Sequence, residues 1–337
     1  FYLKDMLRSA IADLGYSEEQ VDIRVYPGVG ASEDRADALL DEVTRELNVD
    51  VATLLVYGYE PQTDSYRIYF RLRNLREGAE VGDEFLNRAL DQDTRDVIAA
   101  QSEVLVSFAS GLVKLYNGDL ARAKEHFETG IAQAEAQEAA AALDTLYFFL
   151  GRTLADLGQP EAARQAYTTA LTYNSEYAMA HIGLGNIIYN EAASHCGKGE
   201  RAACERLDLA ITAYHSALES GSTHYITWME GKAHINIGNV YTLRGQVEGD
   251  VSQLDQAIAA YDEALAAYER DDARTEYLAL AHYVRGLAYE RRALLKPEDE
   301  RAPDFERATA DYEWCAEHAG ARVQLAQECS KRLERVK

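Results

Sequence analysis

The chain has 337 residues, of which 57 are acidic and 34 are basic, so its formal net charge at pH 7 is −23. Proteins bind nucleic acids and anionic membrane surfaces through Lys and Arg side chains, so this charge argues against both partners. It is compatible with a basic protein or peptide partner, and also with a charge that only keeps the protein soluble. No apolar run is long enough to span a membrane. The chain begins at Phe1 rather than Met, so we expect it to be a region of a longer protein.

Residues 1–82 have the pattern of a small α/β domain with the element order α-β-α-β-β. The expected elements, in this order, cover residues 2–15, 21–26, 32–48, 51–60 and 65–74. The loop PGVGAS follows the first strand, where a phosphate-binding loop would lie. It lacks the lysine and the second glycine of a P-loop, so a turn is the better interpretation. Residues 83–103 carry a helical pattern and no flexible linker, which predicts a connecting helix.

Residues 104–320 contain a motif that recurs five times. An alanine is followed four positions later by an aromatic residue, and three positions after that by a small residue. This spacing places all three side chains on one face of a helix. The occurrences are Ala123-Phe127-Gly130, Ala163-Tyr167-Ala170, Ala210-Tyr214-Ala217, Ala257-Tyr261-Ala264 and Ala308-Tyr312-Cys315.

A glycine stands inside an apolar helical pattern upstream of each motif. Glycine in a helix interior costs about 1 kcal/mol relative to alanine, so its recurrence indicates that a partner helix packs closely there. The glycines are Gly111, Gly151, Gly185, Gly238 and Gly286.

The later repeats are longer than the first two. From the glycine to the alanine the distance is 12 residues in the first two repeats and 25, 19 and 22 residues in the last three. We therefore expect insertions near 190–203, 244–250 and 292–302, which either form polar surface loops or lengthen the helices. The final segment, 321–337, is predicted to be a capping helix that covers the end of the array.

These residues resemble the tetratricopeptide-repeat (TPR) family. Its first helix carries Leu-Gly and then Tyr, and its second helix carries Ala, an aromatic residue and Ala. The second-helix pattern is present in all five repeats, and Tyr241 and Tyr289 occupy the later Tyr position of the first helix. The resemblance implies a mostly α fold, a TPR-type α-α superhelical solenoid of about five hairpins over 104–320, preceded by the small α/β domain.

The resemblance also implies a concave groove, lined by the first helix of each repeat, that binds a protein or peptide. Asn186 and Asn239 directly follow the repeat glycine, and stacked asparagines hold an extended peptide in some TPR proteins. The alternative is that they bond only to water or to neighbouring helices. TPR domains that clamp a terminal carboxylate need more basic residues than Lys232 and Arg152, so that activity is not carried over. The implied groove residues are Phe148, Arg152, Ile182, Asn186, Tyr189, Asn190, Lys232, Ile235, Asn239, Tyr283 and Leu287.

Two functional hypotheses follow from this reading. The first is a non-catalytic binding scaffold within a larger bacterial signalling or assembly protein. The second is a sensor in which the α/β domain binds a small molecule and the array relays this to a fused effector. No catalytic triad, HExxH motif, metal cluster or phosphate loop stands out, so we predict neither an enzyme nor a metal or cofactor. The sequence leaves the oligomeric state open.

The four cysteines leave two alternatives. Cys196 and Cys204 close a short segment, and Cys315 and Cys329 lie on successive predicted helices, so each pair is able to form a disulfide. The other alternative is four ordinary thiols. Disulfides would indicate a location outside the cytoplasm, and free thiols a cytoplasmic one.

Three histidines, His181, His234 and His282, share one repeat position, which suggests a metal site or a pH sensor. Neighbouring repeats lie about 10 Å apart, too far for shared ligation, so packing against the paired helix is the better interpretation. His195 stands next to Cys196, but adjacency in sequence does not create the geometry of a nucleophile pair.

Overall fold

The structure is a computed structural model of the chain. It describes residues 51–60, 65–74, 84–86, 104, 107–108, 110–112, 114–115, 117–136, 143–198, 200–220, 228–270, 275–320 and 322–336. The chain divides into two compact units, residues 1–175 and residues 176–337. None of the described helices combines the length and the apolar character that crossing a lipid bilayer requires.

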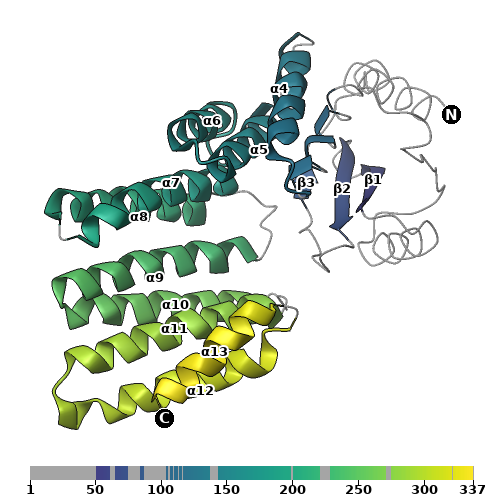
Figure 1. Cartoon of the computed structure of the whole chain (residues 1–337). Helices are drawn as coiled ribbons and strands as arrows, with labels where there is room; N and C mark the ends of the chain where they lie inside the picture. The colour runs from purple at the N-terminus through teal and green to yellow at the C-terminus, as the bar shows by residue number, and fades with distance from the viewer. Residues whose placement is uncertain are drawn as a thin grey trace. The chain divides into compact units, whose positions relative to one another are not determined.

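A three-stranded antiparallel sheet with the strand order β1-β2-β3 lies in the first unit (Figure 1). β1 (Val51–Glu60) pairs with β2 (Ser65–Asn74) along its whole length, from Val51 opposite Asn74 to Glu60 opposite Ser65. Both strands are rich in β-branched and aromatic residues, which suit a pleated sheet. They occupy the two ranges, 51–60 and 65–74, over which the sequence predicts strands.

Within residues 83–103, where the sequence predicts a connecting helix, residues 84–86 instead form a third strand. β3 (Glu84–Leu86) pairs with β2, and Phe85 lies opposite Tyr69. Its hydrogen-bond partners are distant in sequence, so a local helical pattern does not reveal them. Residues 87–103 lie outside the described residues, as do the predicted elements over 2–15, 21–26 and 32–48. The α/β domain as a whole therefore stays a prediction.

Helices α4 (Leu120–Ala136), α5 (Leu143–Asp156) and α6 (Pro160–Tyr173) complete the first unit. In the turn between α5 and α6, Gly158 has a φ of 72°, a left-handed conformation that glycine adopts without strain. Phe108, which precedes α4, packs against Phe127 and Phe149 with ring centroids 6.1 and 5.3 Å apart. The first two repeats therefore share one aromatic core.

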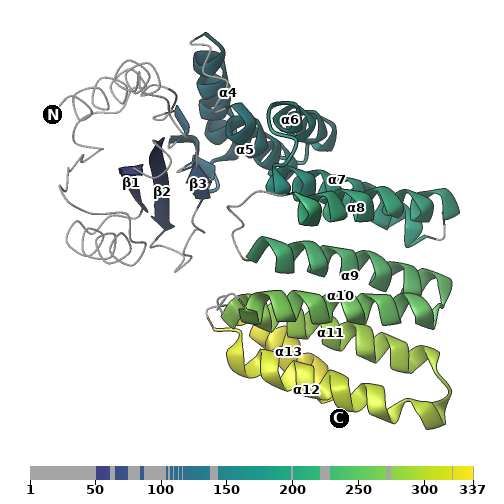
Figure 2. The ribbon, with the colours of Figure 1, turned by 180° about the vertical axis from the view of Figure 1, so that it is seen from behind.

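The second unit consists of three helical hairpins followed by one further helix (Figures 1 and 2). The hairpins are α7–α8, α9–α10 and α11–α12, and α13, which lies within the segment 321–337, packs against α12. The helix bounds are α7 (Ala178–Cys196), α8 (Arg201–Glu219), α9 (Trp228–Glu248), α10 (Val251–Arg270), α11 (Thr275–Leu295), α12 (Ala302–His318) and α13 (Val323–Val336).

The insertions of the last three repeats lengthen their helices and do not form long loops. Helices α7 and α8 have 19 residues each, whereas α5 and α6 have 14 each. Only a short segment, 197–200, separates α7 from α8, and only residues 249–250 separate α9 from α10. Between α11 and α12 the connection contains a short 3₁₀ helix, Glu298–Glu300. The extra turns at the end of α7 bury Ala192 and Cys196, so the inserted residues extend the core.

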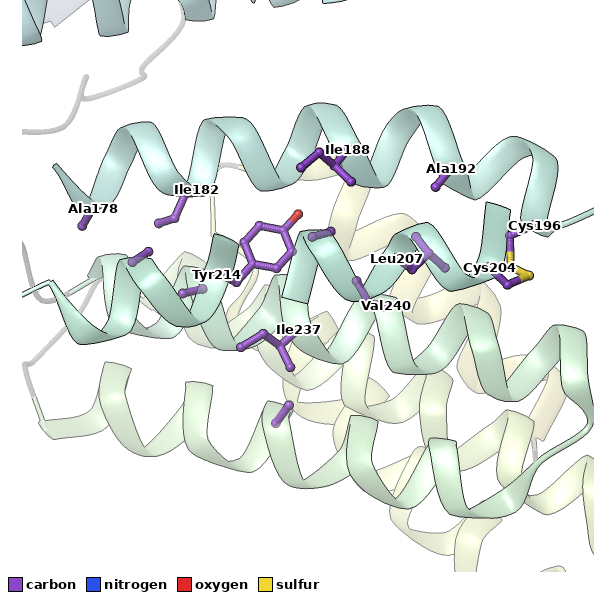
Figure 3. Close-up of a cluster of buried hydrophobic side chains, with 14 of the residues drawn as sticks. Ala178, Ile182, Ile188, Ala192, Cys196, Cys204, Leu207, Tyr214, Ile237 and Val240 are labelled. Atoms are coloured by element: carbon purple, nitrogen blue, oxygen red, sulfur yellow. A yellow bond between two sulfur atoms is a disulfide. The ribbon is translucent and has the colours of Figure 1, made fainter. Parts of the chain in front are cut away.

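One steric contact recurs in every repeat and explains both sequence signals. A Cβ atom added to the repeat glycine would lie 2.4 to 2.8 Å from the aromatic ring in the centre of the motif. Only glycine leaves room for that ring, because real Cβ atoms do not approach so closely. The pairs are Gly111 with Phe127, Gly151 with Tyr167, Gly185 with Tyr214, Gly238 with Tyr261, and Gly286 with Tyr312. In the third repeat, Figure 3 shows the Tyr214 ring between α7 and the following helices, among Ile182, Ile188 and Ile237.

Two disulfides join neighbouring helices of the second unit. Cys196 at the end of α7 is bonded to Cys204 in α8, with their Cα atoms 4.7 Å apart (Figure 3). Cys315 in α12 is bonded to Cys329 in α13, with a Cα separation of 6.0 Å. Both separations are those of ordinary disulfides. No described cysteine is left as a free thiol.

Candidate functional site

The first helix of each repeat, here called the A helix, carries the residues for which the sequence predicts peptide binding. In the second unit the A helices are α7, α9 and α11, and their partners α8, α10 and α12 are the B helices. We call the partly or fully exposed side chains of α7, α9 and α11 the A-helix face. Its central members are Asn186, Tyr189, Asn190, Asn239, Leu287 and Arg291.

Three of the predicted groove residues are not available to a partner, and the prediction is corrected for them. Phe148, Ile182 and Ile235 are only 3%, 1% and 5% exposed. Each lies three residues before its repeat glycine, and this position packs into the core between helices. The counterpart in the last repeat, Tyr283, is partly exposed and contacts Tyr312, with ring centroids 6.2 Å apart.

The remaining predicted groove residues keep part of their surface. They are Arg152 on α5, Tyr189 and Asn190 on α7, Lys232 on α9, and Tyr283 and Leu287 on α11, in addition to the two asparagines. Burial raises the pKa of Tyr189, and the nearby charge of Arg291 partly offsets this shift. The Tyr189 phenol is therefore neutral at physiological pH and able to donate a hydrogen bond.

The two asparagines that follow the repeat glycine are held by the tyrosines of their own repeats. Tyr214 donates its hydroxyl hydrogen bond to Asn186 Oδ1 over 2.9 Å, and Asn236 Nδ2 donates to the same oxygen over 3.0 Å. In the next repeat, Tyr261 donates to Asn239 Oδ1 over 2.8 Å. These contacts orient both amides, and the bond from Asn236 also links α9 to α7.

The tyrosine hydroxyls are fixed as donors because their surroundings suppress ionisation. Burial raises the pKa of Tyr214 and Tyr261 well above the ordinary value of a phenol. Tyr261 also has Thr242 Oγ1 at 3.1 Å, and since its own proton points to Asn239, the threonine hydroxyl donates in that contact. Because Oδ1 of each asparagine already accepts a hydrogen bond, the Nδ2 group is the part of the side chain that remains available as a donor. Among the described residues, neither Asn186 Nδ2 nor Asn239 Nδ2 has a hydrogen-bond partner.

The last repeat replaces this neutral arrangement by ion pairs. Leu287 occupies the position of the two asparagines, and Tyr312 donates instead to Glu290 Oε2 over 2.7 Å. The same carboxylate accepts a bond from Arg332 of α13 over 3.2 Å. Deeper between α11 and α12, Arg285 binds Asp311 through two hydrogen bonds of 2.9 and 2.7 Å.

Among the three histidines of the shared repeat position, His282 has the most clearly defined partners. His282 Nδ1 lies 2.7 Å from Asp311 Oδ1, and its ring stacks on Trp314 with centroids 4.3 Å apart. Burial lowers the pKa of His234. His195 lies 3.1 Å from Glu200, and its neighbour Cys196 is in a disulfide, so the two residues do not form a thiol–imidazole pair. The described residues contain no group of three or more His, Cys, Asp or Glu side chains that could hold a metal ion.

One residue of this face, Arg291, is absent from the sequence-based prediction. It lies four residues after Leu287, and hence one turn further along the same face of α11. The family pattern gives no reason to choose it, because its counterparts in the two preceding repeats are Asn190 and Leu243. The adjacent arginines Arg291 and Arg292 look alike in the sequence, and only the structure shows that Arg292 hydrogen-bonds an aspartate.

The comparisons with known proteins agree with the repeat pattern. Residues 144–177, which cover α6 and all of α5 except Leu143, match the family model described as tetratricopeptide repeat. No curated protein matches the chain.

Three solved structures illustrate the likeness. MamA protein is 21% identical, with 64% of this chain and 94% of that chain covered and a TM-score of 0.40. A thermophilic TPR protein of Thermus thermophilus is 16% identical, with 68% and 99% covered and a TM-score of 0.49. YrrB, described as a TPR protein with an unusual peptide-binding site, is 16% identical, with 72% and 98% covered and a TM-score of 0.39. Likenesses this distant identify no partner or site.

The described helical part is an array of paired helices in which one glycine–aromatic contact recurs in every repeat. Together with the match over residues 144–177, this array identifies the chain as a tetratricopeptide-repeat protein.

Proposed function

We propose that the A-helix face of the second unit binds an extended peptide segment of a partner protein. TPR proteins are typically non-catalytic scaffolds that bind proteins or peptides. The observation that supports the assignment here is the pair of amide donors. Asn186 and Asn239 occupy equivalent positions in adjacent repeats, and their Nδ2 groups have no partner among the described residues.

The spacing of the repeats suits an extended backbone. Packed helices lie about 8–10 Å apart, and an extended chain advances about 3.3 Å per residue. Each repeat therefore corresponds to about three peptide residues, and successive asparagines can donate to every third carbonyl. The tyrosine bonds fix both amides before the peptide arrives, which lowers the entropic cost of binding.

Neutral amides recognise a backbone, whereas the partly exposed Tyr189, Asn190 and Leu287 can contact the peptide's side chains. The net charge of −23 favours partners with basic residues outside these contacts. The sensor hypothesis has no comparable support, because most of the predicted α/β domain lies outside the described residues.

The test removes the two donors and keeps the two acceptors. In the double variant Asn186→Asp and Asn239→Asp, each carboxylate oxygen can still accept the tyrosine bond, but the Nδ2 donor is gone. Peptides selected by the wild-type chain from a random 12-residue display library serve as probes, and fluorescence anisotropy measures their affinity. Each neutral hydrogen bond contributes about 0.5–1.5 kcal/mol, so the double variant should bind about tenfold or more weakly.

The matched control adds the same two charges elsewhere. Gln246→Glu and Gln324→Glu change exposed glutamines on α9 and α13, and together they should leave the affinity unchanged. Equal affinity of the wild type and the double Asp variant would contradict the site. Failure of the wild type to select any peptide would contradict the function itself.

A further inference from the structure

Arg291 on α11 has no hydrogen bond or ion pair with a carboxylate among the described residues. Its neighbours in sequence and space all bind carboxylates: Arg285 binds Asp311, Arg292 binds Asp304, and Arg332 binds Glu290. Among the arginines of the second unit whose side chains are described, Arg291 alone is partly buried and has no hydrogen bond, ion pair or ring contact.

The surroundings of Arg291 make a charge without a partner energetically unfavourable. Burial lowers the pKa of its guanidinium, and the charge of Arg332 lowers it further, whereas Tyr261, Tyr312 and Glu290 raise it. Glu290 is already held by Tyr312 and Arg332, so it does not serve as the partner of Arg291. An arginine stays protonated at neutral pH even so. A partly desolvated cation without a partner costs free energy, which a bound anion would recover.

Arg291 also continues the row of donors on the A-helix face. Asn186 and Asn239 present amides from α7 and α9, and Leu287 takes the equivalent place on α11. One turn further along α11 lies Arg291, whose charge acts on Tyr261 of α10 and on Tyr189 of α7. A peptide that crosses α7 and then α9 would next meet this guanidinium.

We propose that Arg291 binds the side-chain carboxylate of a glutamate or aspartate in the peptide held by Asn186 and Asn239. This inference rests on the proposed function. A guanidinium offers two parallel N–H donors that match a carboxylate. Because Arg291 is partly buried, a carboxylate at the end of a flexible side chain reaches it more readily than one attached directly to the peptide backbone.

The acidic character of the chain does not oppose this contact. Charges on the surface are screened over about 8 Å at physiological ionic strength, so a net charge of −23 acts mainly on the approach of the peptide. Association of an acidic peptide should therefore become faster as the salt concentration rises, whereas the preference for the carboxylate should change little.

The test compares peptides that differ only in this carboxylate. Library-selected 12-residue peptides are synthesised with acetylated and amidated ends, and each glutamate or aspartate is replaced in turn by glutamine or asparagine. We expect one position at which the acid binds the wild type at least about tenfold more tightly, since hydrogen bonds to charged groups contribute about 1.5–3 kcal/mol. The variant Arg291→Gln should lose this preference and still bind the neutral peptides. The control Arg335→Gln removes an exposed arginine of α13 and should keep it.

Each other outcome has a defined meaning. A carboxylate preference that persists in Arg291→Gln overturns the inference but leaves the proposed function intact. A preference seen only for peptides with a free C-terminus, and lost in Arg291→Gln, assigns the terminal carboxylate instead and overturns the side-chain version. If no peptide binds, the proposed function fails together with the inference. A second variant needs no ligand: Arg291→Leu introduces the residue found at Leu243, and it should raise the midpoint of thermal unfolding because it removes an unpaired charge.

Discussion

The hairpins α9–α10 and α11–α12 share one steric design and differ in polarity. In both, the repeat glycine lies against the motif tyrosine, Gly238 against Tyr261 and Gly286 against Tyr312. In α9–α10 the residues that precede this glycine and this tyrosine are Ile237 and Ala260, which belong to one apolar cluster. In α11–α12 the same two positions hold Arg285 and Asp311, which form a buried ion pair.

The difference shows that the contact between glycine and tyrosine is common to both hairpins, whereas the residues next to it can be either apolar or charged. The ion pair is tolerated because its polar groups are satisfied. Asp311 accepts bonds from Arg285 and lies next to His282, and Arg285 also binds Asp262 over 2.6 Å. A buried pair of this kind is weak evidence for stability but is costly to break.

The largest expected effect comes from breaking that pair. Asp311→Ala leaves the Arg285 charge without its buried partner and should lower the free energy of unfolding by about 3–5 kcal/mol. Asp262 contacts the same arginine but is 53% exposed, so Asp262→Ala should cost at most about 1 kcal/mol. Urea unfolding followed by circular dichroism measures both variants.

The double variant Arg285→Ile and Asp311→Ala sharpens the comparison. It gives α11–α12 the apolar pair of α9–α10, and it should recover most of the loss caused by Asp311→Ala, because neither charge is left unpaired. A double variant that is less stable than Asp311→Ala would show that the two hairpins are not interchangeable at these positions.

The two hairpins also differ in their covalent links. A disulfide joins α12 to α13, whereas α9–α10 contains no cysteine. Cys315→Ala with Cys329→Ala should lower the stability by about 2–4 kcal/mol, because the unfolded chain gains freedom. Cys196→Ala with Cys204→Ala opens a shorter loop, of sequence separation 8 rather than 14, and should cost slightly less. Mass spectrometry without reduction first establishes whether each pair is linked, and free thiols would remove the basis of this prediction.

The shared steric contact predicts a smaller and similar loss in both hairpins. Gly238→Ala would place a Cβ 2.4 Å from the Tyr261 ring, and Gly286→Ala would place one 2.8 Å from the Tyr312 ring. Overpacking of this kind costs about 1–3 kcal/mol. Thermal unfolding should give the larger loss for Gly238→Ala. A gain in stability for either variant would contradict the close packing of glycine and ring.

The smallest expected effect is a change in how the stability of α11–α12 depends on pH below about pH 4. Burial by itself raises the pKa of Asp304, but hydrogen bonds from Arg292 and Lys296 outweigh it, so the pKa lies below its usual value of 3.8. As the pH falls, Asp304 is therefore protonated in the unfolded chain before it is protonated in the folded chain. The stabilisation that its ionised form gives is present above about pH 4 and is lost as the pH falls further. Asp304→Asn should flatten the acid limb of a stability–pH curve. An unchanged limb would show that Asp304 is not linked to acid unfolding.

The positions of most helices of the array can be predicted from local sequence, whereas the residues of the candidate site can be predicted only in part. The spacing of Ala, an aromatic residue and a small residue locates the B helices, because residues four and three apart share a helix face. The same register counted Ile182 and Ile235 as groove residues, although both are buried. Spacing gives the face of a helix, but it does not say how many other helices cover that face.

Position alone also left the role of the asparagines open. The equivalence of Asn186 and Asn239 was visible in the sequence, but their orientation depends on Tyr214 and Tyr261 of the B helices. The difference between Arg291 and Arg292 was likewise hidden, because Arg292 meets Asp304 only once α12 has folded back along α11.

The repeat follows from the local sequence, since a ring and the glycine that makes room for it must recur together wherever two helices pack this closely. The same spacing gives the length of the later repeats, but not that the added residues would continue the helices. Which polar groups are satisfied, and which are left to bind something else, depends on the folded arrangement of the helices. That outcome depends on partners far apart in the chain, such as Glu290 with Arg332, and no local pattern encodes such a pairing.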